Sequence, residues 1–236
     1  MWTADKIYYS GSDNFVRAYQ GRILVWDKRL PPNNSIYYTS TDQQIVIPYR
    51  PNNFGGANIV SNTYTNGQGV IVFDQDVTTI GYMAFYDLDK LETVILPATI
   101  TTIGRDSFRM LRDSSSPEDN PLNSVIIPEG VISLERRCFY GVNRLPSITI
   151  PSTCTSIGAD AFEYCTSLSE VIINATVPPV LGAGDPDQYG EVYHQFDFTT
   201  ITHITNYGYI KVPPESVNSY KTATGWSKYE SRIISQ

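Results

Sequence analysis

The sequence is poor in the residues on which enzyme and metal sites are usually built. It has 2 histidines and 3 cysteines, and charged residues make up only 17% of its 236 residues. His194 and His203 both lie in one irregular segment, and no Gly-x-Ser-x-Gly motif supplies a nucleophile that either could activate. The cysteines form no Cys-x-x-Cys pair, the usual start of a zinc site. We therefore expect no catalytic residue, no metal and no cofactor.

Basic runs and long apolar runs are missing as well. The formal net charge is −7 and Lys and Arg never cluster, so the phosphates of a nucleic acid would meet no basic stripe. No stretch approaches the roughly 20 apolar residues of a membrane-spanning helix. Neither Gly-x-x-x-x-Gly-Lys-Ser/Thr nor Gly-x-Gly-x-x-Gly occurs. Together these absences argue against nucleic acid, nucleotide and membrane insertion.

What the chain has instead is a repeat. The block Ile80-Gly81-x-x-Ala84-Phe85 returns three times, with spacings of 23, 31 and 23 residues. Its later copies are Ile103-Gly104-x-x-Ser107-Phe108, Leu134-Glu135-x-x-Cys138-Phe139 and Ile157-Gly158-x-x-Ala161-Phe162. The eight extra residues of the middle spacing fall within Arg112–Pro121, which is polar and acidic and is predicted to be a surface loop.

A second pattern keeps the same phase. Leu91-x-x-Val94-Ile95-Leu96-Pro97 recurs from Leu122, Leu145 and Leu168, with a degenerate copy at 71–74 and a late copy at 210–213. Short β-branched runs ended by Pro or Asn indicate strands. Each unit is predicted to be a strand, a turn, a second extended piece such as 77–80, and a short helix such as 84–88. Stacked units would share one core and one parallel sheet.

Residues 70–233 resemble BspA-type leucine-rich repeats of bacterial surface proteins. The Ile-Gly-x-x-Ala-Phe blocks and the Leu-x-x-Val-x-Ile-Pro strands carry the resemblance, and 212–229 is similar to the closing cap of such proteins. Two features depart from the pattern: Glu135 replaces a Gly, and Gly182–Tyr207 interrupts the final unit. The resemblance implies an α/β repeat solenoid with a parallel sheet and short helices, in an extracellular or cell-surface protein.

The two ends of the chain differ from the repeat. Residues 1–69 show only an echo of Ile7–Asp13 at Ile36–Asp42 and a hairpin signal about Gln20-Gly21, so we expect a small β-rich N-terminal module that caps the solenoid or stands beside it. Residues 70–236 would form the solenoid and a C-terminal helical cap. The first residues lack the charged and then apolar order of a signal peptide. Three alternatives therefore stay open: export by another route, a signal that has been removed, or an internal location.

Two groups of side chains have a structural and a functional interpretation. Cys138, Cys154 and Cys165 fall in apolar columns of the repeat, which favours buried thiols over a disulfide. Asp185, Asp187 and Glu191 could offer oxygens to calcium. Their spacing lacks the twelve-residue calcium loop, which favours a solvated turn.

One column of the strands has a candidate functional role. Val94 and Leu96 are expected to face the core, so Ile95 between them points to the other side of the sheet. The candidate partner face comprises this column, Ile95, Ile126, Thr149 and Ile172, and the flanking Thr93, Ser124, Ser147 and Glu170. An apolar row here is either covered by the N-terminal module or a loop, or open as a binding strip.

Three functions remain possible from the sequence. The resemblance implies a non-enzymatic recognition or adhesion module whose macromolecular partner is a host or bacterial surface protein, or a glycan. The alternative is a structural part of a larger surface or phage-like assembly. An enzyme is the weakest hypothesis, because no acid–base pair or metal set stands out.

Overall fold

The computed structural model describes all residues except 1–5, 11–14, 21–22, 112–119, 184–193, 198 and 202–207. At the N-terminus it describes the backbone pairing of three strands. These are β1 (Lys6–Ser10), β2 (Phe15–Gln20) and β3 (Ile23–Arg29), antiparallel in the order β1-β2-β3. No described helix is long and apolar enough to cross a membrane.

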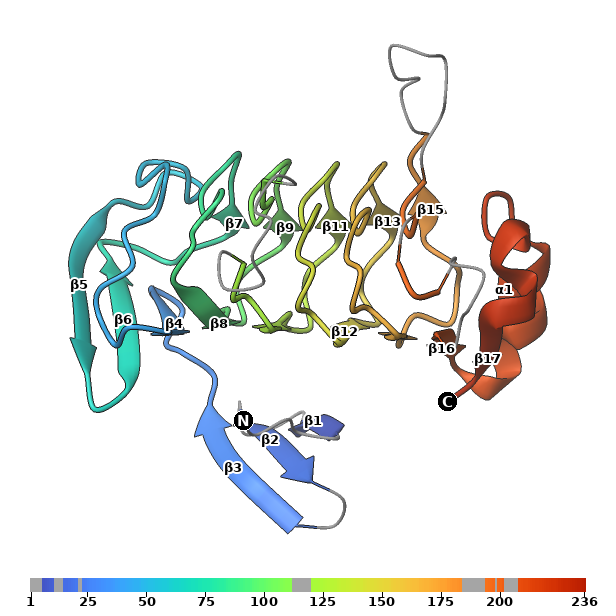
Figure 1. Ribbon diagram of the computed structural model, residues 1–236, viewed down its shortest axis with the longest axis horizontal. Coiled ribbons are helices and arrows are strands. Elements are labelled where there is room, and N and C mark those ends of the chain that lie inside the picture. The colour runs from blue at the N-terminus through green and yellow to red at the C-terminus, as the bar shows by residue number, and fades with distance from the viewer. Residues whose placement is uncertain are drawn as a thin grey trace.

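The predicted repeat strands lie side by side along one face of the stack (Figure 1). They are β8 (Leu91–Ile95), β10 (Ser124–Ile126), β12 (Ser147–Ile150), β14 (Glu170–Ile173) and β16 (Tyr209–Val212). β8 pairs parallel with β10, and β12, β14 and β16 form a second parallel ladder that β17 (Ile233–Ser235) extends. The four strand runs and the late copy are therefore confirmed.

A second parallel sheet runs along the opposite side of the core (Figure 1). Its strands are β7 (Thr79–Ile80), β9 (Thr102–Ile103), β11 (Ser133–Leu134), β13 (Ser156–Ile157) and β15 (Val180–Leu181), paired in that order. This confirms the second extended piece of each unit. A glycine follows four of these strands, whereas Glu135 follows β11. These glycines allow close stacking, because a Cβ on Gly104 would lie 2.7 Å from the Ile80 carbonyl oxygen.

The start of the repeat sheet differs from the simple stack. β4 (Ser35–Ser40) lies between β8 and β6 (Gln68–Phe73) and is antiparallel to both, and β5 (Ile59–Thr65) forms the outer edge. The degenerate copy at 71–74 thus supplies a strand, β6, but β4 separates it from the next repeat strand. Tyr38 fixes this insertion, because its hydroxyl donates to Asn62 Oδ1 at 2.8 Å and accepts the Val46 N–H at 3.1 Å.

The predicted short helix of each unit is wrong, because these segments are tight turns. The same position in each turn has a positive φ, at Met83 (56°), Asp106 (54°), Arg137 (55°) and Asp160 (58°). A right-handed helix cannot continue through a left-handed residue. Among the described residues the one α-helix is α1 (Val217–Thr222), which lies between the 3-10 helices η2 (Pro214–Ser216) and η3 (Ser227–Arg232) in the predicted C-terminal cap.

The turns carry a ladder of buried phenylalanines through the core. Phe85, Phe108, Phe139 and Phe162 stack with centroids 5.2, 5.3 and 5.4 Å apart and ring planes within 10° of parallel. Phe196 continues the ladder, and Trp226 and Tyr229 of the C-terminal cap pack on it. The Trp226 indole donates to the Pro179 carbonyl at 2.8 Å, which fixes the cap on the last coil.

The three cysteines are free and buried, as their columns predicted. Cys165 Sγ lies 3.0 Å from the Phe139 carbonyl oxygen and Cys154 Sγ lies 3.4 Å from that of Ser156. Burial raises the pKa of all three thiols, in the case of Cys154 to about 11. These thiols therefore act as small core side chains rather than as nucleophiles.

Candidate interaction surfaces

The predicted partner face divides into two halves. On β8 and β10, Ile95 and Ile126 are only 7% and 2% exposed and form a small cluster with Leu30 and Tyr37. Thr93, half-buried beside them, exchanges a hydrogen bond of 2.8 Å with Thr39 Oγ1, and Ser124 is also half-buried. The segment around β4 thus covers this half of the row.

The other half lies on β12 and β14 and is accessible. Ser147 is exposed, and Thr149, Glu170 and Ile172 are half-buried. In register, Ser147 lies beside Glu170, and Thr149 lies beside Ile172. The four side chains therefore form two adjacent rows across the strands.

β16 extends both rows with residues that the sequence interpretation left out. Tyr209, 39% exposed, lies beside Glu170, and Lys211 lies beside Ile172 and forms an ion pair with Glu170. The late repeat copy at 210–213 places Lys211 in the same column as Ile172. The open sheet face is defined here as Ser147, Thr149, Glu170, Ile172, Tyr209 and Lys211.

A second surface is formed by the turns that carry the phenylalanine ladder. There arginines lie over tyrosine rings, with the Arg109 guanidinium carbon 5.0 Å from the Tyr140 centroid and 5.9 Å from that of Tyr86. Arg105 lies 5.8 Å from the Tyr82 centroid, and Arg137 lies 5.6 Å from that of Tyr140. Contacts of this kind hold planar guanidinium groups against aromatic faces. We refer to this surface as the Tyr–Arg turn surface.

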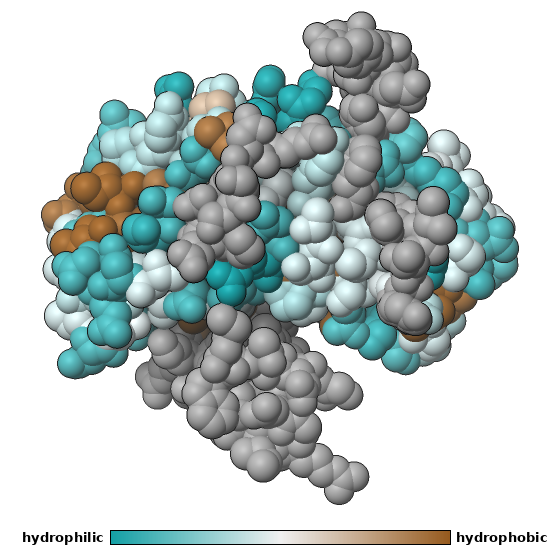
Figure 2. Space-filling model, viewed as in Figure 1, coloured by the Kyte–Doolittle hydropathy of each residue, from teal (hydrophilic) through white to brown (hydrophobic). Residues whose placement is uncertain are grey.

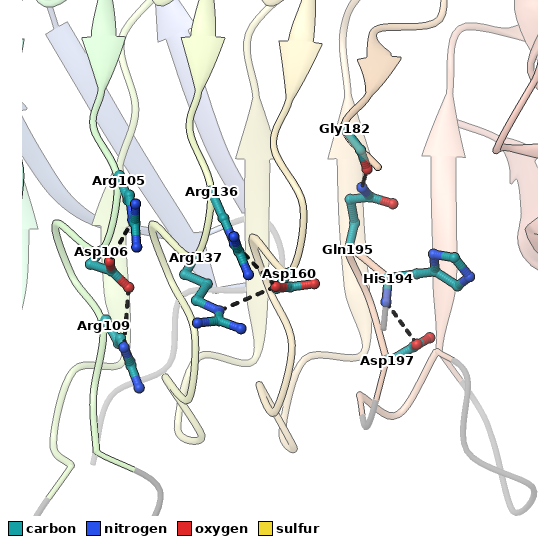
Figure 3. A network of polar contacts seen from close by, with 10 residues as sticks. All are labelled: Arg105, Asp106, Arg109, Arg136, Arg137, Asp160, Gly182, His194, Gln195 and Asp197. Atoms are coloured by element: carbon teal, nitrogen blue, oxygen red, sulfur yellow. Dashed lines mark hydrogen bonds and ion pairs between the residues drawn. The ribbon is translucent and has the colours of Figure 1, made fainter. Parts of the chain in front are cut away.

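Two buried carboxylates fix the arginines of this surface (Figure 3). Asp106 accepts from Arg105 Nε at 3.1 Å and from Arg109 at 3.4 Å. Asp160 accepts from Arg137 Nε at 3.2 Å and lies 3.5 Å from Arg136 Nε. Asp106 and Asp160 lie in separate turns, and each contacts two arginines. The two aspartates therefore hold the arginine side chains in place and do not form a pair of catalytic carboxylates.

The described residues 194–197 of the irregular segment form a turn. The His194 backbone N–H donates to Asp197 Oδ2 at 2.8 Å, and the Gln195 amide donates to the Gly182 carbonyl at 2.6 Å (Figure 3). Within the described part of the chain, no group of three His, Cys, Asp or Glu side chains could hold a metal ion. His203, Asp185, Asp187 and Glu191 lie outside the described residues, as do residues 112–119 of the predicted loop Arg112–Pro121.

One group of exposed apolar side chains lies at the end of the molecule that carries β5. On the face shown in Figure 2, hydrophobic residues gather mainly at the end that carries the edge strand β5. Ile45, Ile47 and Val60 are exposed there, and the Asn62 amide donates to the Val46 carbonyl at 2.9 Å, which joins their two segments. Edge strands with apolar side chains are prone to pair with other chains.

Two parallel sheets on stacked coils, with one phenylalanine per turn, define a leucine-rich-repeat type of fold. A family model for the BspA type leucine rich repeat region matches residues 57–177 in six copies, just over half of the chain. The chain therefore belongs to the BspA-type leucine-rich-repeat family. No protein in the curated set matches it.

Two solved structures resemble the chain. One is a leucine rich cell surface protein from Faecalibacterium prausnitzii A2-165, with 21% identity over 55% of this chain and 37% of that chain and a TM-score of 0.34. The other is a leucine-rich repeat protein from Bacteroides ovatus ATCC 8483, with 17% identity over 74% of this chain and 49% of that chain and a TM-score of 0.31. The matches thus span less than half the length of either protein.

Proposed function

We propose that the chain is a non-enzymatic recognition module of a bacterial cell-surface protein that binds a macromolecular partner. The observation that carries the proposal is the open sheet face, which combines the exposed ring of Tyr209 and the apolar Ile172 with the Glu170–Lys211 ion pair. Such an extended surface suits a macromolecule better than a small substrate. Tyrosine and aliphatic contacts beside charged groups are typical of protein interfaces.

We also propose how the chain is divided. Residues 70–236 would form the solenoid with its C-terminal cap, and residues 1–69 a small β-rich module. The antiparallel pairing of β4 with β8 favours a cap joined to the repeat sheet over a module that stands beside it. A cap of this kind would protect the first edge of the stack.

Binding of the labelled chain to a panel of host extracellular proteins and to bacterial cells tests the proposed function. The variant Ile172→Lys places a charge in the middle of the open sheet face and should weaken the strongest interaction by at least about tenfold. Thr222→Lys, at an exposed position of α1, is the matched control and should bind like the original chain. Equal binding by both variants would rule out this face. Binding confined to subunits of one assembly would favour the structural alternative.

A further inference from the structure

The first turn of the stack, before the repeat blocks, forms an open depression of about 610 Å³. Its lining residues are Tyr49, Arg50, Pro51, Asn52 and Asn53. The segment leads into Phe54, whose ring meets Phe85 edge-on at 5.6 Å and so begins the phenylalanine ladder. The depression therefore lies at the N-terminal end of the Tyr–Arg turn surface and shares no residue with the open sheet face.

The backbone holds this turn firmly against the next coil. The Gly81 N–H donates to the Asn53 carbonyl at 2.7 Å, and the Asn53 amide donates to the Tyr82 carbonyl at 2.7 Å. The Asn53 N–H also donates to the Arg50 carbonyl at 3.2 Å, which closes the turn. The side chains of the depression consequently project from a fixed backbone, a condition that favours binding without a large cost of ordering.

Arg50 differs from the other arginines of the surface. Its guanidinium carbon lies 5.3 Å from the Tyr82 centroid and 6.0 Å from that of Tyr49. Among the described residues, no carboxylate lies within ion-pair distance of Arg50, whereas Arg105 and Arg109 both pair with Asp106. Arg50 is thus an exposed cation, oriented by two rings, whose charge is not taken up by the described part of the chain.

We propose that this depression binds an acidic sugar, a pyranose ring that carries a carboxylate, as part of a glycan. The Arg50 guanidinium would bind the carboxylate through two parallel N–H···O bonds. Tyr49, which lines the depression and is 56% exposed, offers aromatic surface to the sugar carbons. The Asn52 side chain offers an amide to the sugar hydroxyls.

The lining favours a glycan over an acidic peptide. A peptide is usually held by a free strand edge or by pockets for its apolar side chains. The depression has neither, because its residues belong to a turn and include no Val, Leu, Ile or Phe. Rings, amides and a guanidinium match the alternating apolar and hydroxyl faces of a sugar.

Titration of the full chain with sialyllactose and with lactose tests the proposal, because the two probes differ only by the acidic sugar. Sialyllactose should bind at least about tenfold more tightly than lactose, and its affinity should fall with added salt. Arg50→Gln should weaken sialyllactose binding by roughly ten- to a hundredfold, the range for loss of a hydrogen-bonded charge pair. Lys221→Gln makes the same charge change on α1 and should leave binding unchanged.

A second variant separates lost binding from lost folding. Arg50→Lys keeps the charge but cannot form the two parallel bonds, so its affinity should fall between those of Arg50→Gln and the original chain. Both variants should keep the original melting temperature, because the Arg50 side chain is exposed. Unchanged binding by Arg50→Gln, or equal binding of sialyllactose and lactose, would overturn the proposal. So would binding of an aspartate-rich peptide at Arg50 without binding of sialyllactose.

Discussion

The rings of Phe162 and Phe196 stack 5.5 Å apart and within 5° of parallel, although 34 residues separate them instead of the usual 23. The backbone repeats the same relationship, because the Phe162 N–H donates to the Gln195 carbonyl at 2.8 Å, as the Phe139 N–H does to Ala161 at 2.9 Å. The irregular segment 182–207 therefore contains a further turn of the repeat. The Phe196 ring of this turn connects the phenylalanine ladder to Trp226 and Tyr229 of the C-terminal cap.

The centre of the phenylalanine ladder should be the most sensitive point of the core. Replacing Phe139 with Ala removes a fully buried ring that stacks on both neighbours, and should lower the free energy of unfolding by roughly 3–5 kcal/mol. Urea denaturation followed by circular dichroism measures this loss. Ile132→Ala, at a residue 49% exposed, is the control and should stay within about 0.5 kcal/mol of the original chain. A loss below about 1 kcal/mol for Phe139→Ala would contradict the ladder as the core.

The turn in the irregular segment should be a structural part of the stack. Phe196 is fully buried and contacts rings on both sides, so Phe196→Ala should cost about as much as Phe139→Ala, roughly 3–5 kcal/mol. The C-terminal cap should loosen at the same time, which hydrogen exchange of the amides in 214–235 would detect. Full protection of these amides in the variant would show that the cap does not depend on the ring.

The ladder and the strands could be predicted because they follow a fixed period. Phe85 and Phe108 mark the phase directly, and β-branched runs mark the strands. The turns could not be predicted in the same way. Met83 and Arg137 adopt the left-handed conformation although neither residue type favours it, so the closure of each coil decides the backbone there.

Long-range pairing was also beyond the sequence. β4 lies in the sheet between β6 and β8, and nothing in its Ile36-Tyr37-Tyr38 sequence predicts that it pairs with these two strands. The burial of Ile95 and Ile126 depends on β4, since Tyr37 of this strand and the nearby Leu30 pack against their cluster. The repeat pattern predicts which residues share the column of the candidate partner face. It does not predict that the half on β8 and β10 is covered, because that depends on the position of β4 in the sheet.

The three thiols should not react in the native protein. A thiol reagent such as 5,5′-dithiobis(2-nitrobenzoic acid) should report almost none at pH 8 and all three after denaturation, because each thiol is buried and its pKa is raised. Rapid reaction of any thiol without denaturant would contradict this prediction.

The same thiols predict a loss of stability at alkaline pH. Below the ordinary thiol pKa of 9.0, Cys154 is protonated both folded and unfolded, so its contribution is fully present. Above that value the unfolded chain ionises first, and stability should fall as the pH rises toward about 11, the raised pKa of Cys154. Urea midpoints between pH 8 and 11 would test this, with Cys154→Ala as the control that shows a smaller slope.

The segment 112–119 should tolerate deletion. The repeat resumes in phase at Leu122, and a change in loop length of this size alters the closure entropy only slightly. The melting temperature of the deletion variant should stay within a few degrees of the original, by differential scanning calorimetry. The deletion must stop before Asn120, which is buried and whose amide donates to the Gly141 carbonyl. A large loss of stability would show that the segment packs on the core.

The two halves of the sheet face predict opposite outcomes for one type of substitution. Ile126→Lys places an ammonium group in the buried cluster of Ile95, Leu30 and Tyr37, so it should destabilise the chain by several kcal/mol. Ile172→Lys places the same group on the half-buried, open part of the face. Lys211 lies beside it on β16 and Glu170 lies two residues earlier on β14, so the loss of stability should be small and the fold should persist. Urea denaturation distinguishes the two variants before any partner is known. An Ile126→Lys variant as stable as Ile172→Lys would mean that the β8–β10 half is open after all, and the partner face would then extend along the whole row.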